Sequence, residues 1–321
     1  MNLTQALKLD AAAETNRIAE AIRSQVLGTM RRKGAVVGLS GGIDSSVVSS
    51  LCVRALGKEH VLGLFMPERD SSDDALTLGR KLADKLGVEA IVEDIAPLLA
   101  AAGCYRRQDE AVKTAVPEYG EGYKFKLVLP SLLEGDRLNI TRLTVQSPSG
   151  ETKTVRLSPE AYLQIVAATN YKQRCRKMTE YYHADRLKYA VAGTPNRLEY
   201  DQGFFVKLGD GAADFKPIAH LYKSQVYQLA EHLGVPDEIR KRPPTTDTFS
   251  LAQTQEEFYF ALPYQRMDEC LYAYNHKMAA GDVAAALNLT PEQVERVYKD
   301  IEAKRRVAQY LHAAPMLVDP V

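Results

Sequence analysis

One segment constrains the fold of this chain more than any other: an apolar run that ends in a glycine turn and continues as a helix. Residues 35–39 (AVVGL) predict a buried strand, because uninterrupted aliphatic residues are typical of parallel sheets. A turn rich in glycine and serine follows over residues 40–46, and an apolar helix is expected from there to about Leu56. The segment therefore predicts one strand–turn–helix unit of an α/β sheet.

The same unit recurs along the chain. Further strands are expected over residues 60–66, 88–95 and 187–193, and a helix that ends at Leu86 separates the first two. Alternating strands and helices predict an α/β fold, with a doubly wound parallel sheet and helices on both of its faces. Other helices are expected over residues 1–33, from residue 158 onward and over residues 290–312.

Residues 105–157 interrupt this alternation. A Ser-Pro-Ser-Gly turn and alternating apolar residues predict a β-hairpin from about residue 137 to 157, with the alternation at Leu138, Ile140, Leu143 and Val145. We expect a single domain over residues 1–321, with residues 105–157 as an inserted β-rich segment. A lid over a site, a surface for a partner and a solvated ornament all remain open as the role of this segment.

Composition limits the function classes. The chain has 321 residues with 41 basic and 41 acidic side chains, so no overall positive field exists to attract nucleic acid. No apolar run approaches the ~20 residues that span a bilayer, and the polar N-terminus lacks the apolar core of a signal peptide. The four cysteines are scattered, which argues against a zinc ribbon or a disulfide framework. We therefore expect a cytoplasmic enzyme with neither a nucleic-acid nor a membrane partner.

The glycine turn predicts an anion-binding site, although a plain connection between strand and helix is the simpler explanation. Glycines allow successive backbone N–H groups to point into one concavity, and the helix directs its positive N-terminal end to the same place. Asp44 would repel a bare phosphate, so it is best explained as a ligand of Mg²⁺ that bridges to phosphate oxygens. The segment has neither the G-K-[ST] of a Walker A loop nor the G-x-G-x-x-G of dinucleotide-binding proteins.

The pattern S-G-G-x-D-S after a buried strand resembles the pyrophosphate loop of the N-type ATP pyrophosphatases. That superfamily includes NAD synthetase, GMP synthetase, asparagine synthetase and tRNA-thiolating enzymes. Three further stretches resemble the NAD synthetases in particular: Asn170-x-x-x-Arg174-x-Arg176-x-Met178, Gly193-Thr194 with Glu199, and residues 203–214 (GFFVKLGDGAAD). The resemblance covers most of residues 15–105 and 165–312.

This resemblance implies that ATP, Mg²⁺ and nicotinic acid adenine dinucleotide meet in one site. Asp44 and Lys223 would be catalytic, and Asp44 with Glu199 would hold Mg²⁺. The residues implied for ATP binding are Gly38, Leu39, Ser40, Gly41, Gly42, Ile43, Asp44, Ser45, Thr194, Lys223 and Thr245. Those implied for the dinucleotide are Arg174, Lys207, Asp214 and Lys304. The resemblance also implies a homodimer, for which the N-terminal helices and the helix 158–187 are the candidate interface.

The activity implied is that of an ATP-dependent, amide-forming ligase that makes NAD. A carboxylate is a poor electrophile, so it is first adenylated with loss of pyrophosphate, and ammonia then attacks the acyl-adenylate and releases AMP. Mg²⁺ and lysines would offset the negative charge that develops on the phosphates. No ammonia-generating domain is visible in the sequence, so free ammonia or a separate glutaminase is expected to supply the nitrogen.

The chain departs from the family at positions that bear on the substrate. The differences are Gly211-Ala212 for two glycines, Lys216 for asparagine, a different loop over residues 246–258, and Ala303-Lys304 for a His-Lys pair. They leave open a NAD-synthetase-like ligase that amidates another carboxylate, such as a sugar acid or a secondary metabolite.

Two further classes of protein fit the sequence less well. A tRNA-thiolating enzyme shares the glycine turn, but it would usually have paired cysteines and a basic face for RNA. A nucleotide-binding regulator without catalytic activity would not need to retain Asp44, Glu199 and Lys223. The sequence therefore favours a ligase over both.

Overall fold

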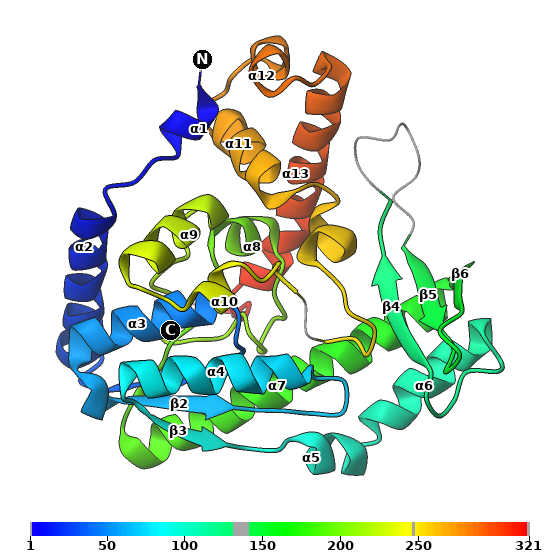
Figure 1. Ribbon diagram of the computed structural model, residues 1–321, viewed down its shortest axis with the longest axis horizontal. Helices are drawn as coiled ribbons and strands as arrows, with labels where there is room; N and C mark the ends of the chain where they lie inside the picture. Colours follow the sequence, from blue (N-terminus) through cyan, green and yellow to red (C-terminus); the bar gives the residue numbers. More distant parts are fainter. Residues whose placement is uncertain (1, 131–140, 246–247, 320–321) are drawn as a thin grey trace.

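A parallel sheet of order β3-β2-β1-β7 lies at the centre of the fold. We describe it from a computed structural model, which covers residues 2–130, 141–245 and 248–319 (Figure 1). The strands are β1 (Ala35–Gly38), β2 (Val61–Phe65), β3 (Glu89–Val92) and β7 (Ala190–Val191). Ala35 pairs with Val61 on one side and with Ala190 on the other, so β1 is an internal strand. The expected α/β fold with a parallel sheet is confirmed.

Helices cover both faces of this sheet, and Figure 1 shows it between α4 and α7. Ala35, Val37 and Phe65 point to one face, against α2 (Ala11–Arg23), α3 (Ile43–Leu56), α4 (Asp73–Leu86) and α9 (Lys223–His232). Val36 and Leu64 point to the other face, where they meet α7 (Pro159–Leu187). Burying a Val, Leu or Phe side chain of this kind stabilises the fold by about 1.5–3 kcal/mol relative to leaving it exposed.

The fourth strand is much shorter than the expected 187–193. Helix α7 continues to Leu187, and Lys188 ends it in the left-handed conformation with φ of 58°. Only Ala190–Val191 then pairs with β1. The third strand is likewise reduced from the expected 88–95 to Glu89–Val92. An apolar run indicates where a strand lies, but pairing with a neighbour decides where it ends.

The inserted segment begins with a helix, α6 (Cys104–Ala115), rather than with strands. Its buried residues follow helical spacing, at Cys104, Gln108, Ala111 and Val112. An antiparallel sheet of order β4-β5-β6 follows, made of β4 (Lys124–Val128), β5 (Arg142–Gln146) and β6 (Thr152–Arg156).

Strands β5 and β6 form the expected hairpin, in which Gly150 N–H donates to the carbonyl of Ser147 at 2.9 Å. Strand β4 is an addition that the sequence pattern does not predict. Leu138 and Ile140, two of the alternating residues of the predicted hairpin, lie outside the described residues, as do residues 246–247 of the divergent loop. That the whole chain forms one domain stays a prediction.

Most of the C-terminal helices share a second apolar core, which includes Leu198, Leu271 and Ile301. It is built from α1 (Leu3–Ala6), α8 (Arg197–Gln202), α11 (Tyr264–Asn275), α12 (Ala280–Leu287) and α13 (Pro291–His312). Three of these helices, α1, α11 and α12, lie at the top of Figure 1. Thr290 and Gln293 form the capping box of α13. The remaining short elements are α5 (Ala96–Ala101), α10 (Asp237–Arg240), the 3-10 helix η2 (Lys58–His60) and the π-helices η1 (Ser24–Thr29) and η3 (Glu256–Phe260).

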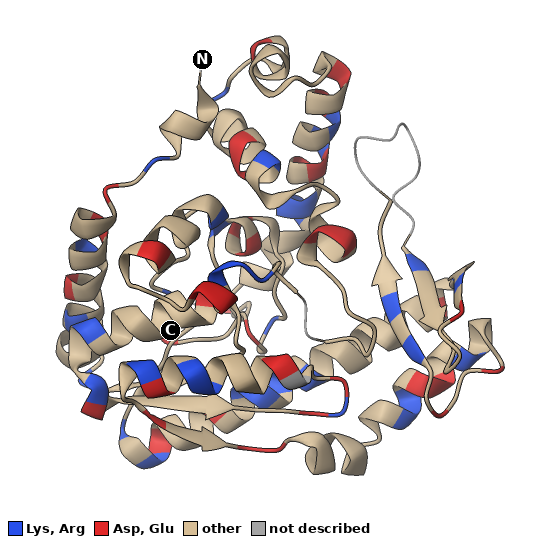
Figure 2. Cartoon of the chain, viewed as in Figure 1, with Lys and Arg blue, Asp and Glu red and all other residues tan. Residues whose placement is uncertain are grey.

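Charged residues of both signs are spread over the helices rather than gathered on one of them (Figure 2). Within the described ranges, no helix has both the length and the apolar character needed to cross a bilayer. All four cysteines are buried and free. The cytoplasmic location stays a prediction.

Candidate active site

The glycine turn lies at the C-terminal end of β1, where the chain enters α3. Gly41 has φ of +70°, and a Cβ atom there would lie 2.5 Å from the carbonyl oxygen of Ala75, so only glycine fits. The Ser40 hydroxyl lies 3.1 Å from that of Ser45 and accepts a hydrogen bond from Gly42 N–H at 3.3 Å. Gly42 is the N-cap of α3, so the N–H groups of the first helical turn follow directly. The turn has the geometry of an anion cradle.

Asp44, in the first turn of α3, joins two other helices. Its Oδ1 accepts a hydrogen bond from Nδ2 of Asn196 at 3.0 Å, and its Oδ2 pairs with Nζ of Lys223. Asn196 is the N-cap of α8, and Lys223 is the first residue of α9. Three helix N-termini that are far apart in the sequence therefore meet at this carboxylate.

Glu199 is also in this cluster, and both of its carboxylate oxygens are held. Oε2 accepts from the N–H of Asn196 at 3.0 Å, within the capping box that begins α8. Oε1 accepts from Nε2 of Gln255 at 2.9 Å. Burial, and then the charge of Asp44, raise the pKa of Glu199 to about 8. Both effects disfavour the ionised form of this carboxyl.

Lys223 is buried in the same cluster. Burial opposes its charge, but the carboxylates of Asp44 and Glu199 outweigh that effect and raise its pKa above the ordinary value. Asp268 of α11 accepts the N–H of Lys223 at 3.1 Å and that of Ser224 at 2.6 Å, so it caps the start of α9. This cap fixes the position from which the ammonium group reaches Asp44.

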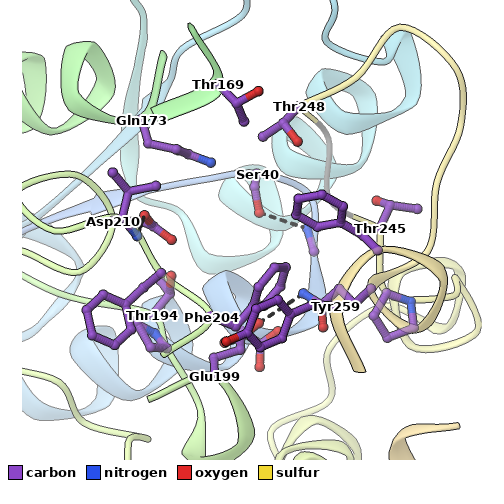
Figure 3. Close-up of a pocket in the computed structure, with 18 of the residues that line it drawn as sticks. Ser40, Thr169, Gln173, Thr194, Glu199, Phe204, Asp210, Thr245, Thr248 and Tyr259 are labelled. Atoms are coloured by element: carbon purple, nitrogen blue, oxygen red, sulfur yellow. Dashed lines mark hydrogen bonds between the residues drawn. The ribbon is translucent and has the colours of Figure 1, made fainter. Parts of the chain in front are cut away.

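Asp44, Glu199 and Lys223 line one cavity of about 820 Å³. Ser40, Glu199 and Tyr259 border the same space in Figure 3. Such a volume suits a large organic ligand. Of the residues expected to bind ATP or the metal, all but Gly41 line it, namely Gly38, Leu39, Ser40, Gly42, Ile43, Asp44, Ser45, Thr194, Glu199, Lys223 and Thr245. Gly41 instead provides the close approach of the turn to Ala75.

Lys304, one of the four residues expected at the dinucleotide, also lines the cavity. Its Nζ donates to the carbonyl of Tyr259 at 2.8 Å and pairs with Asp300 at 2.6 Å. Burial lowers the pKa of this lysine. A basic group therefore stands in the cavity wall beside an aromatic side chain.

Arg174, Lys207 and Asp214 do not line this cavity. Nε of Arg174 donates to the carbonyl of Lys207 at 3.2 Å, and the Lys207 ammonium donates to the carbonyls of Tyr310 and Ala313 at 2.9 Å each. Asp214 accepts the N–H of Val191 at 2.7 Å beside the end of the sheet. A role of these three residues in substrate binding stays a prediction, and it requires a surface outside the cavity.

Helix α7 presents Arg176 and Lys177, rather than Arg174, to the cavity. The Arg176 guanidinium lies 3.4 Å from the hydroxyl of Ser71, and Lys177 pairs with Glu180 at 2.6 Å. Residues two positions apart on a helix point in different directions. The spacing of two residues could therefore have indicated from the sequence that Arg174 and Arg176 do not face the same site.

Asn196, Gln255 and Asp268 are further residues of the site that sequence reasoning does not single out. Asn196 does carry a local signal, because Asn-x-x-Glu before a helix is the pattern of a capping box. Gln255 and Asp268 carry none, because their partners Glu199 and Lys223 are 56 and 45 residues away in the sequence. Only long-range packing brings them to the site.

The donor set fits a magnesium ion. Asp44 and Glu199 supply carboxylate oxygens, and Mg²⁺ typically binds through one or two carboxylates, waters and the phosphates of a substrate. The raised pKa of Glu199 is consistent with a place for added positive charge. In the part of the chain that the structure describes, no cluster of three or more His, Cys, Asp or Glu side chains forms a more enclosed metal site.

A parallel α/β sheet with a glycine turn and a carboxylate–lysine cluster after an internal strand is typical of nucleotide-binding α/β proteins. Comparison with known proteins narrows this class. The family model described as NAD synthase matches residues 14–117 and 137–308. The chain belongs to the NAD synthase family, as the resemblance of its motifs predicts.

Individual relatives agree with this assignment. The NH3-dependent NAD⁺ synthetase of Mesorhizobium japonicum is 71% identical over 97% of this chain and 98% of its own length. The NH3-dependent NAD⁺ synthetase of Thermotoga maritima is 36% identical over 90% of this chain and 94% of its own length. Among solved structures, the NMN synthetase from Francisella tularensis has a TM-score of 0.64 at 22% identity and covers 98% of this chain and 99% of its own. The NH3-dependent NAD synthetase from Campylobacter jejuni has a TM-score of 0.62 at 23% identity, with coverage of 97% and 100%. These two structures support the fold.

Proposed function

We propose that this chain is an ATP-dependent ligase that amidates nicotinic acid adenine dinucleotide with ammonia and yields NAD, AMP and pyrophosphate. The observation that carries the proposal is the cluster of Asp44, Lys223 and Glu199 beside the glycine turn in one cavity. The 71% identical relative named NH3-dependent NAD⁺ synthetase supports the choice of reaction, because the two chains match over nearly their whole lengths.

In this proposal the glycine turn holds the end of ATP that departs. The N–H groups of residues 40–46 and the N-terminal end of α3 bind the β- and γ-phosphates. The substrate carboxylate attacks the α-phosphorus, the bond to the bridging oxygen breaks, and pyrophosphate leaves. Lys223 offsets the charge that develops on the departing group, and its burial strengthens that effect because little water screens it.

Mg²⁺, held by Asp44 and Glu199, would act as a Lewis acid that neutralises phosphate charge. Asn196 keeps both carboxylates in place, since its side chain donates to Asp44 and its backbone N–H to Glu199. Ammonia then adds to the acyl carbon of the adenylate, its nitrogen loses a proton to solvent, and AMP departs with the electron pair of the broken carbon–oxygen bond. These residues act mainly by position and charge, as is usual in phosphoryl-transfer chemistry.

We further propose that the enzyme is a homodimer in which the exposed side of α7 meets a second copy. Met178 and Tyr182 are 57% and 64% exposed on that helix, and Leu208, next to Lys207 in the sequence, is 71% exposed. Large exposed apolar residues that gather on one element are typical of an interaction surface. Arg174 is exposed on the same helix, so a second subunit could complete a dinucleotide site around it and Lys207.

The decisive experiment is a substrate comparison with the purified chain. With ATP, Mg²⁺ and ammonium chloride, nicotinic acid adenine dinucleotide should give equal amounts of NAD and AMP. Glutamine in place of ammonia should give little product unless a separate glutaminase is added. AMP formation with another carboxylate but none with the dinucleotide would refute the proposal and favour a related ligase of different substrate.

A further inference from the structure

Leu129 and Thr141 of the insertion line the cavity directly. A stretch from elsewhere in the chain, residues 248–260, also lies between the inserted sheet and the cavity, and we call it the wall segment. It runs alongside β4. The N–H of Leu251 donates to the carbonyl of Phe125 at 3.0 Å, and the N–H of Phe125 donates to the hydroxyl of Ser250 at 3.0 Å. The N–H of Leu129 donates to the carbonyl of Glu257 at 2.9 Å. Hydrogen bonds therefore attach the wall segment to β4 at residues 250–251 and, at Glu257, to Leu129, the residue that follows β4.

Side chains add to this attachment. Nε2 of the buried Gln253 donates to the carbonyl of Leu127, and Lys126 pairs with Glu257 at 2.9 Å. Phe249 is a core residue of the inserted sheet, because its ring meets that of Phe125 edge-on at 5.5 Å between centroids. Removing the wall segment from β4 would expose this core to water.

The other side of the wall segment faces the nucleotide end of the cavity. Thr248, Gln255, Phe258 and Tyr259 all line the cavity. Gln255 donates to Oε1 of Glu199 at 2.9 Å, and the Tyr259 hydroxyl donates to the carbonyl of Gln202 at 2.6 Å. Buried Lys172 of α7 also donates to the carbonyl of Thr248 at 3.3 Å. The same short stretch thus contacts β4, α7 and α8.

We propose that the inserted sheet is a positioning element of the active site, which acts through the wall segment and Gln255 on the carboxylate of Glu199. This inference rests on the proposed function for its kinetic consequence. Gln255 and Asn196 each hold one oxygen of Glu199, so together they fix the plane of the carboxylate. A hydrogen-bonded partner that orients a metal-binding carboxylate commonly controls metal affinity.

Strand β4 lies within residues 118–136, between the two ranges that match the family model. The pattern common to the family therefore does not account for this attachment. The contacts of β4 with the wall segment argue against a solvated ornament, which is one of the roles that the sequence leaves open for the insertion.

The first test weakens the attachment of the wall segment at residues that do not line the cavity. The double variant Lys126→Ala with Gln253→Ala removes the ion pair to Glu257 and the hydrogen bond to the Leu127 carbonyl, and it leaves the Ser250 hydrogen bond and the Phe249 ring contact in place. Hydrogen–deuterium exchange of peptides from residues 248–260 should become faster by roughly tenfold or more in the free enzyme. The matched control is Lys153→Ala, which removes an ion pair to Glu118 inside the insertion that does not involve the wall segment. Unchanged exchange in the correctly folded double variant would overturn the proposal.

The second test removes only the hydrogen bond from Gln255 to Glu199. In Gln255→Leu the side chain keeps its approximate size but donates no hydrogen bond. The Mg²⁺ concentration for half-maximal rate should rise by roughly tenfold, with a much smaller change in kcat at saturating Mg²⁺. The affinity for Mg²⁺ with ATP, measured by calorimetry without dinucleotide or ammonia, should fall by the same factor. An unaltered Mg²⁺ dependence in both measurements would contradict the role of Gln255.

These readouts separate the inference from the proposed function. If the wild-type chain forms no NAD, the proposed reaction is wrong, but exchange in the wall segment and calorimetric binding still report on positioning. If the wild type forms NAD while both variants behave like it, the reaction stands and the positioning role fails. Circular dichroism and the melting temperature of each variant exclude loss of the fold as the cause.

Discussion

Lys223 is the buried cation that pairs with Asp44 beside the glycine turn. It is 1% exposed and pairs with Asp44, and Asp268 determines where its helix begins. A buried ammonium between two carboxylates is costly to remove, because each carboxylate then lacks its compensating charge. Its position at the first residue of α9 also means that its backbone and its side chain serve different partners.

We predict that Lys223→Met slows AMP formation by roughly 100-fold or more, because one preorganised charge at the departing group is lost. The measurement is a steady-state assay with ATP, dinucleotide and ammonia. Lys241→Met is the control, because Lys241 is 77% exposed and pairs only with exposed Asp237 among the ion pairs of the described residues. A folded Lys223→Met protein with near-normal rate would contradict the assignment of Lys223.

Asp268 gives a prediction that depends on pH. Burial raises its pKa to about 6 from an ordinary value of 3.8, so the folded chain holds a proton between those values that the unfolded chain has lost. Its contribution to stability therefore falls as pH rises from about 4 to 6, by roughly 3 kcal/mol at most, and is constant above that.

Asparagine at position 268 has no such proton to lose. The destabilisation caused by Asp268→Asn should therefore be larger at pH 4 than at pH 7, although the substitution weakens the cap of α9 at both. Urea unfolding of the two proteins at several pH values measures the difference. A difference that does not vary with pH would mean that Asp268 titrates alike in the folded and unfolded chains.

At the scale of elements, the turn between β1 and α3 combines two requirements in one glycine. Gly41 needs both a left-handed backbone and the absence of a side chain next to Ala75. The sequence could predict the turn from its glycines, and it could predict the flanking strand and helix from their apolar residues. It could not predict Ala75 as the neighbour, because that contact depends on how α4 packs.

We predict that Gly41→Ala destabilises the protein by about 2 kcal/mol or more, from backbone strain and the clash together, and that it weakens ATP binding. Gly28→Ala is the matched control, because no atom lies within 4 Å of the added Cβ there. That change should stabilise the helix by up to about 1 kcal/mol. Thermal unfolding and ATP titration of both variants measure these effects, and equal behaviour of the two would contradict the account of the turn.

At the scale of the whole molecule, the proposed homodimer would account for the predicted substrate residues that lie outside the cavity. The cavity holds the predicted nucleotide groups, while Arg174 and Lys207 lie outside it. A dinucleotide that spans the cavity of one subunit and the outer side of α7 would contact both the residues in the cavity and Arg174 with Lys207 outside it. The exposed Met178 and Tyr182 favour this side as the place where the copies meet.

We predict that sedimentation at micromolar concentration gives the mass of a dimer, and that Met178→Asp with Tyr182→Asp shifts it toward monomer, because buried charges oppose association. The KM for the dinucleotide should then rise more than the KM for ATP. Leu98→Asp on α5 is the control for an exposed apolar residue elsewhere, at 41% exposure. A wild-type monomer with full activity would refute the shared site.

The class of fold, the glycine turn and the family all follow from the sequence, because they depend on local patterns: apolar runs, turn residues and contiguous motifs. The choice of charged residues that share the cavity follows from packing instead. Arg176 rather than Arg174 faces it, Asp268 caps the helix of Lys223, and Gln255 reaches Glu199 from a segment bound to β4. Such contacts join residues far apart along the chain, so their partners depend on how whole elements pack, which no local pattern encodes.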